Sequence, residues 1–153
     1  MLNEYARLAR PFFVMLAIVT TGRWLLGTAF HVPYDKGTSA MSIVTLTLFA
    51  SILSTVFLRR WLGWRLPTAA GFAMYMAVVS QVVILLSTAV SYALGIDSYF
   101  SNPMALNRQT ELVGFGAAMG FRAGGLVVNT LLNGIAGALG WALGGLLPPR
   151  ADR

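Results

Sequence analysis

Apolar residues occur along this chain in four long runs, and the shorter segments between the runs hold most of the charged residues. The runs cover residues 11–30, 40–58, 68–94 and 123–147. A helix of about 20 apolar residues crosses the ~30 Å hydrocarbon core of a bilayer, and each run is about that long or longer. The pattern predicts an all-α integral membrane protein, a single domain over residues 1–153 with four transmembrane helices in a bundle.

Local signals mark the ends of three of these helices. Ser39 is placed to cap the start of the second helix, because serine accepts a hydrogen bond from a free backbone N–H at that position. Pro67 suits the first turn of the third helix. Pro148 and Pro149 follow the fourth run, which a helix cannot continue through.

The composition supports a membrane protein and its threading. Only 10% of the residues are charged, whereas a soluble domain has roughly 25%. With four crossings, three arginine-bearing segments lie on one side of the membrane, and the positive-inside rule makes that side cytoplasmic. Both termini are therefore expected in the cytoplasm. The arginines concerned are Arg7 and Arg10, then Arg59, Arg60 and Arg65, and finally Arg150 and Arg153.

The basic residues also bear on origin and partners. Ten of the eleven are arginine, a bias that indicates a GC-rich bacterial genome, so we expect a multi-pass protein of the bacterial inner membrane. The net charge of +6 follows from the positive-inside rule, and no nucleic-acid partner is expected. The expected partners are membrane lipids and other membrane protein chains.

The segment 112–121 is apolar and glycine-rich, and it precedes the fourth run. Joined to that run it would make a helix of roughly 36 residues, or ~54 Å, which exceeds the hydrocarbon thickness. We therefore expect a separate element before the last helix. It lies flat at the outer surface, or it re-enters the membrane within the protein.

Small and polar residues share one face of the fourth helix. Thr130, Asn133, Gly137, Gly140 and Gly144 recur at spacings of three and four, which places them on one side of a helix. Small residues let two membrane helices approach closely, and Asn133 is able to add a hydrogen bond between helices. This face packs inside the bundle, packs against another protein chain, or lines a groove.

Arg23 interrupts the first apolar run, about seven residues before its outer end. A charged side chain at that depth is usually partnered or functional. Snorkelling to the outer surface opposes the tilt of helical side chains towards the helix N-terminus. We therefore expect a buried, partnered arginine. The polar groups available to it at the outer side are Asp35, Asp97, Glu111 and Gln81.

Arg23, Trp24 and His31 form the candidate site for a ligand or a lipid head group. The ligands considered are a lipid phosphate, a quinone oxygen or an anion. His31 is the only histidine, so one chain cannot supply two histidine ligands to a haem, although a single axial ligand stays open. No metal site is expected and no cofactor is assigned.

Motifs of catalysis are missing from the sequence: there is no H-E-x-x-H, P-loop or G-x-S-x-G. We therefore expect a non-catalytic subunit that packs by its glycine face within a larger inner-membrane complex, such as a respiratory or photosynthetic one. One alternative is a small homo-oligomeric channel or carrier in which Arg23 attracts an anion. Another is a quinone- or lipid-binding membrane protein.

Overall fold

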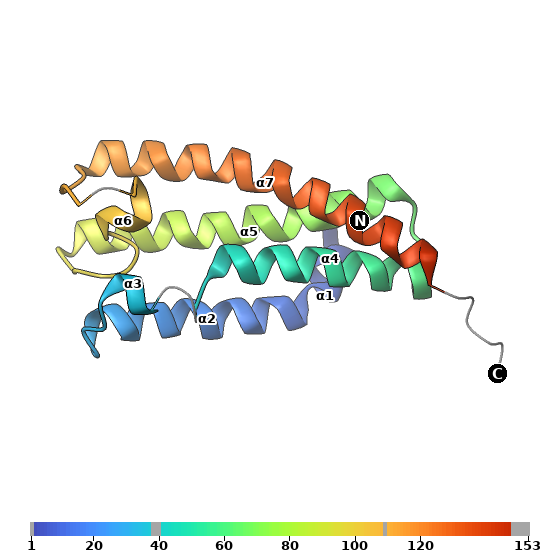
Figure 1. Ribbon diagram of the computed structural model, residues 1–153, viewed down its shortest axis with the longest axis horizontal. Helices are drawn as coiled ribbons and strands as arrows, with labels where there is room; N and C mark the ends of the chain where they lie inside the picture. The colour runs from blue at the N-terminus through green and yellow to red at the C-terminus, as the bar shows by residue number, and fades with distance from the viewer. Residues whose placement is uncertain (1, 38–40, 109, 148–153) are drawn as a thin grey trace.

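The computed structural model describes residues 2–37, 41–108 and 110–147, and every regular element in those ranges is a helix (Figure 1). In chain order these are α1 (Leu2–Leu8), α2 (Arg10–Thr28), α3 (Tyr34–Gly37), α4 (Ile43–Leu62), α5 (Leu66–Ala93), α6 (Pro103–Leu106) and α7 (Phe115–Leu146). The helices α2, α4, α5 and α7 are long and apolar enough to cross a membrane. The protein is therefore an all-helical, multi-pass membrane protein, as predicted.

The four long helices run roughly along one axis, so the bundle has two distinct ends (Figure 1). We call one the α3 end, because α3 and α6 lie there with the last turn of α2 and the first turn of α7. The other is the α1 end, which holds α1, the turn between α4 and α5 and the last turns of α7. Among the described residues, the arginines of the positive-inside argument belong to the α1 end. They are Arg7, Arg10, Arg59, Arg60 and Arg65.

The helix boundaries follow local capping chemistry. Ser42 caps α4 by accepting a 3.3 Å hydrogen bond from the backbone N–H of Thr45, whereas the predicted cap Ser39 lies outside the described residues. At the other end, α4 continues to Leu62, four residues beyond the predicted end, and stops at Gly63. Gly63 has φ of 64°, a left-handed conformation that glycine adopts without strain. Pro67 occupies the first turn of α5, as predicted. The predicted stop at 148–149 also lies outside the described residues.

The separate element expected over 112–121 is not formed as predicted. Helix α7 begins at Phe115 and continues without interruption to Leu146, so residues 115–121 are its first two turns. Glycine in a helix costs about 1 kcal/mol relative to alanine but does not end the helix. At ~1.5 Å per residue, α7 is ~48 Å long. The thickness of the membrane limits only the part of a helix inside the hydrocarbon, which is why length alone was a poor guide here.

The glycine face of α7 packs within the chain, against α4 and α5. A Cβ atom added to Gly137 would lie 2.5 Å from the Cβ of Ala73 in α5. One added to Gly144 would lie 2.9 Å from the carbonyl oxygen of Val56 in α4. Only residues without a side chain allow this approach, so the face that was considered for a partner chain is already used by the bundle.

Asn133 adds hydrogen bonds to the same interface. It is 1% exposed, and its side-chain oxygen accepts a 2.7 Å hydrogen bond from Ser51 of α4. Its amide donates to the carbonyl oxygen of Asn129 at 2.8 Å. The predicted hydrogen bond between helices is thus confirmed. The hydroxyl of Thr130, one helical turn from Asn133, is buried without a hydrogen-bond partner among the described residues.

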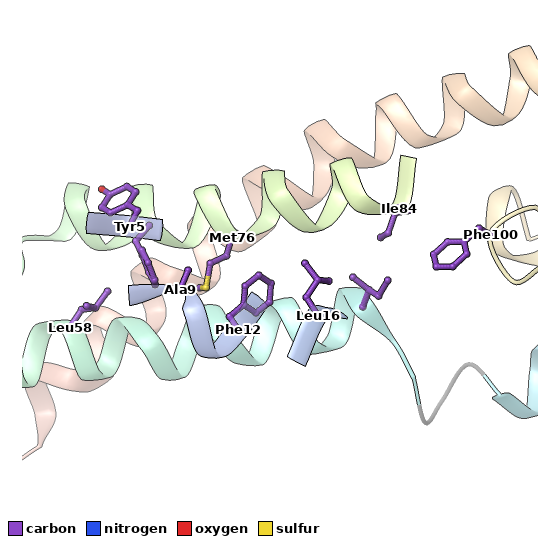
Figure 2. Close-up of a cluster of buried hydrophobic side chains, with 10 residues drawn as sticks. Tyr5, Ala9, Phe12, Leu16, Leu58, Met76, Ile84 and Phe100 are labelled. Carbon is purple, nitrogen blue, oxygen red and sulfur yellow. The ribbon is translucent and has the colours of Figure 1, made fainter. Parts of the chain in front are cut away.

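The apolar core runs as a row along the bundle from the α1 end to the α3 end (Figure 2). Phe72, Met76 and Phe100 are its most deeply buried large side chains, and α2 contributes Phe12 and Leu16. Helix α2 packs against α4 much less extensively than α4, α5 and α7 pack against one another. The bundle is therefore a tight group of three helices with α2 lying along its side.

At the α1 end, Arg59 and Trp141 join α4 to α7. The guanidinium of Arg59 lies 3.7 Å from the centre of the Trp141 ring and donates to the Trp141 carbonyl oxygen at 2.9 Å. The indole N–H of Trp141 donates to the carbonyl oxygen of Trp64 at 2.7 Å. Stacking and hydrogen bonding satisfy this arginine within the protein.

Candidate functional site

Arg23 is buried near the α3 end, as predicted, with only 8% of its surface exposed. Its Nη1 donates a 2.9 Å hydrogen bond to the carbonyl oxygen of Met41. The guanidinium also lies 5.6 Å from the ring centre of Tyr99 and 5.4 Å from that of Phe100. Its partners are therefore a backbone carbonyl and aromatic faces. The acids proposed as partners were the wrong choice, since none contacts Arg23 within the described part of the chain.

A second arginine, Arg122, reaches the same region from α7. Its Nε donates to Thr88 Oγ1 at 3.0 Å. Its Nη2 donates to the carbonyl oxygen of Phe100 at 2.9 Å, and its Nη1 donates to that of Ala105 at 3.2 Å. Arg122 thus connects α5 and α7 to the loop that follows α5. Nothing in the sequence singled out Arg122 for this role.

Both arginines line one cavity of about 120 Å³ at the α3 end. Tyr34 from α3, Ser42 at the start of α4 and Phe100 from the loop after α5 complete its polar and aromatic wall. The remaining wall is aliphatic, with Ile43, Val44, Ile84 and Ala105. A single water needs only about 15 Å³, so this cavity has room for a polyatomic group.

The charge around this cavity is not balanced by its walls. Arginine stays protonated in proteins and carries five N–H donors. Arg23 uses one donor within the protein and Arg122 uses three, which leaves donors on both side chains. No acid belongs to the cavity wall, and Asp35, in the helix that contributes Tyr34, is exposed. A buried charge at Arg23 and a partly buried charge at Arg122 are unfavourable without a counter-charge, and both would be stabilised by an anion between them.

Tyr99 holds α3 against this site. Its hydroxyl donates to the carbonyl oxygen of Val32 at 2.8 Å, and its ring meets that of Tyr34 edge to face at 5.3 Å. Burial raises the pKa of Tyr99, although the positive charge of Arg23 acts in the opposite direction. The hydroxyl therefore stays protonated and able to donate. Gly27 and Gly37 make room for this tyrosine, because a Cβ atom at either position would collide with it.

The other two predicted site residues lie beside the arginine cavity and do not line it. The ring of Trp24 packs against Phe100 at 5.6 Å between ring centres, on the residue that also faces Arg23. His31 is exposed and lines a neighbouring polar cavity of about 210 Å³ with Asp97 and Asn102. Tyr34 borders both cavities. Arg23 therefore shares its cavity with Arg122, whereas His31 lines a separate cavity.

Comparison of this chain with protein-family models, with curated proteins and with solved structures finds no match. The function is therefore argued from the chemistry of the site.

Proposed function

We propose that this protein is an anion-binding membrane protein that holds a phosphate-like or other oxyanionic group between Arg23 and Arg122. The observation that carries the proposal is that both guanidinium groups line one cavity whose wall contains no acid. The N–H donors of the planar guanidinium group match the spacing of the oxygens in phosphate and carboxylate groups. Two guanidinium groups therefore favour a ligand with several oxygens.

Arg59 provides a comparison within the same chain. It stacks on Trp141 and lines none of the cavities described here. Its position at the end of α4, in the last turn, is one where a cation is favourable. Arg23 also makes one hydrogen bond and aromatic contacts, but its guanidinium lies farther from the rings, at 5.4–5.9 Å, and it lines the cavity from inside α2, away from a helix end. A structural role explains Arg59 and leaves the charge of Arg23 uncompensated.

The distribution of arginine gives the proposed orientation. The α1 end is placed in the cytoplasm by the positive-inside rule, so the anion site opens towards the outer leaflet of what we propose is a bacterial inner membrane.

The hypothesis of a subunit in a larger complex loses the feature that motivated it, since Gly137, Gly140 and Gly144 are buried against α4 and α5. The anion-binding alternative gains a second arginine.

Binding is tested on the full chain purified in an uncharged detergent. Thermal unfolding is followed while sodium phosphate replaces sodium chloride at constant ionic strength. Ligand that binds only the folded protein stabilises it by about 2.7 kcal/mol at one hundred times its dissociation constant. We expect Tm to rise and saturate for the wild type. Arg108→Gln, an exposed arginine in the loop before α7, serves as the matched control and keeps this rise.

Two variants remove the site in different ways. Arg23→Gln removes one charge, and Val44→Trp narrows the cavity while both charges remain. Each is expected to lose the phosphate-dependent rise in Tm. Equal rises in the wild type and in both variants would contradict the proposal.

Phosphate efflux from liposomes that contain the protein, if abolished by Arg23→Gln, would identify the binding site as part of a transport path.

A further inference from the structure

An apolar groove of about 420 Å³ lies between α2 and α5 on the way to the arginine cavity. Phe13, Leu16 and Ala17 form its α2 side, and Val79 and Val83 form its α5 side. The groove exists because α2 packs loosely beside the group of three tightly packed helices. In a membrane, such a groove is filled by an apolar chain, since no water is present to fill it.

The lining residues of the groove and of the cavity adjoin one another along the same two helices. On α2, Thr20 lines the groove and Arg23 lines the cavity; three residues separate them, which is ~4.5 Å along the helix and nearly the same face. On α5, Val83 lines the groove and the next residue, Ile84, lines the cavity. One molecule with an anionic head and an apolar tail fits this arrangement.

The length of the groove suits the tail of a membrane lipid. From Phe13 to Thr21 it follows eight residues of α2, or ~12 Å. One leaflet contributes half of the ~30 Å hydrocarbon core, so an acyl chain reaches ~15 Å inwards from its head group. A tail that begins below Arg23 therefore ends close to Phe13.

A polar atom in the groove also lacks a partner. The hydroxyl oxygen of Thr20 is buried without a hydrogen-bond partner among the described residues. It lies about one turn below Arg23, at the level where a phospholipid carries its ester oxygens beneath the phosphate. A buried hydroxyl is stabilised when it donates to such an oxygen.

We infer that the arginine cavity and the groove together bind one anionic phospholipid from the leaflet at the α3 end. Its phosphate lies between Arg23 and Arg122, its ester oxygen accepts from Thr20, and one acyl chain lies between α2 and α5. The lipid carries no ammonium group, because the cavity wall holds no acid to pair with one. This inference rests on the proposed anion site and adds the identity of the molecule that fills it.

Native mass spectrometry of the purified protein tests the inference with three probes. These are phosphatidylglycerol, diacylglycerol with the same chains, and glycerol phosphate, which has the head group alone. The wild type is expected to bind phosphatidylglycerol most tightly. Ala17→Trp fills the groove and should weaken phosphatidylglycerol binding at least about tenfold, because it excludes several methylenes. Ile18→Trp, the neighbouring exposed position outside the groove, should not.

The outcomes separate this inference from the proposed function. Arg23→Gln should weaken both phosphatidylglycerol and glycerol phosphate. If glycerol phosphate binds and Ala17→Trp leaves phosphatidylglycerol binding unchanged, the anion site stands and the lipid inference is overturned. If diacylglycerol binds as tightly as phosphatidylglycerol, the groove binds chains without the arginines, which also overturns it. If no probe binds, the proposed function fails as well.

Discussion

Ser51 of α4 donates a 2.7 Å hydrogen bond to the side chain of Asn133 of α7, and both residues are fully buried. This is the polar contact that joins the two helices in the middle of the bundle. Both side chains are shut off from solvent, so neither group can find water when the other is removed.

Ser51→Ala should therefore destabilise the fold. The variant leaves the side-chain oxygen of Asn133 buried without this donor, and we expect a loss of about 1 kcal/mol. Ser54→Ala is the matched control, because Ser54 lies on the same helix but lines a different groove with Leu8 and Phe72. Unfolding in a titration with denaturing detergent measures both free energies. Equal values for the two variants would contradict the role given to the bond.

Gly140→Ala should weaken the packing of α7 on α4. A Cβ atom there would collide with the carbonyl oxygen of Ile52 and the hydroxyl of Thr55, and the backbone of α4 cannot move aside cheaply. We expect about 1–3 kcal/mol of destabilisation. Gly124→Ala on the same helix has open space around it and should be neutral or slightly stabilising. The same detergent titration compares them, and a neutral Gly140→Ala would show that the interface is looser than described.

Arg122→Gln should loosen the loop between α5 and α7. The variant removes the donors that reach the carbonyl oxygens of Phe100 and Ala105. Hydrogen exchange over residues 98–106 should become faster, by about tenfold for a loss of ~1.4 kcal/mol of local stability. Arg108→Gln, in the same loop but exposed, should leave exchange unchanged. Unchanged exchange in Arg122→Gln would mean that other contacts hold the loop.

Trp141→Leu should separate the α1 ends of α4 and α7. It removes the ring on which Arg59 stacks and the donor to the carbonyl oxygen of Trp64, and we expect about 2 kcal/mol of destabilisation. Trp61→Leu is the matched control, since Trp61 is half exposed and contacts Phe57 of its own helix. Thermal unfolding followed by circular dichroism compares the two, and equal Tm values would argue against the contact.

Stability should fall in alkaline solution as Tyr99 ionises. Burial raises its pKa in the folded protein above the ordinary value of about 10. A tyrosine shifted in this direction contributes its full stability below pH ~10, and the contribution is lost as the pH rises through the folded pKa. Tyr99→Phe should flatten this loss, as measured by Tm against pH. Tyr5, whose pKa is also raised by burial, titrates in the same range, so Tyr5→Phe is run in parallel.

Much of the fold was predictable because the membrane imposes it. A bilayer requires long apolar helices, so the four runs marked the four long helices, and the depth of Arg23 predicted its burial. The partner of Arg23 was not predictable, because a backbone carbonyl such as that of Met41 leaves no mark in a sequence. The pairing with Arg122 was missed because it depends on how the loop after α5 folds, which brings Phe100 into contact with both arginines.

The glycine face shows a second limit. The spacing of Gly137, Gly140 and Gly144 predicts close approach of a helix, and the structure has that approach. The same spacing serves contacts within a chain and contacts between chains, since both bring a backbone against small residues. Only the arrangement of α4 and α5 decides between them.

The distance between two interfacial side chains on α7 is close to the thickness of the hydrocarbon core of a membrane. Arg122 and Trp141 are 19 residues apart on this helix, or ~29 Å along its axis, which matches the ~30 Å hydrocarbon core. Tryptophan and arginine both favour the boundary between hydrocarbon and head groups, so we expect one boundary at the Trp141–Arg59 contact and the other at Arg122. The turns of α7 before Arg122 and after Trp141 then stand clear of the hydrocarbon on either side. We therefore expect the side chain of Arg122 to lie at the level of the lipid head groups.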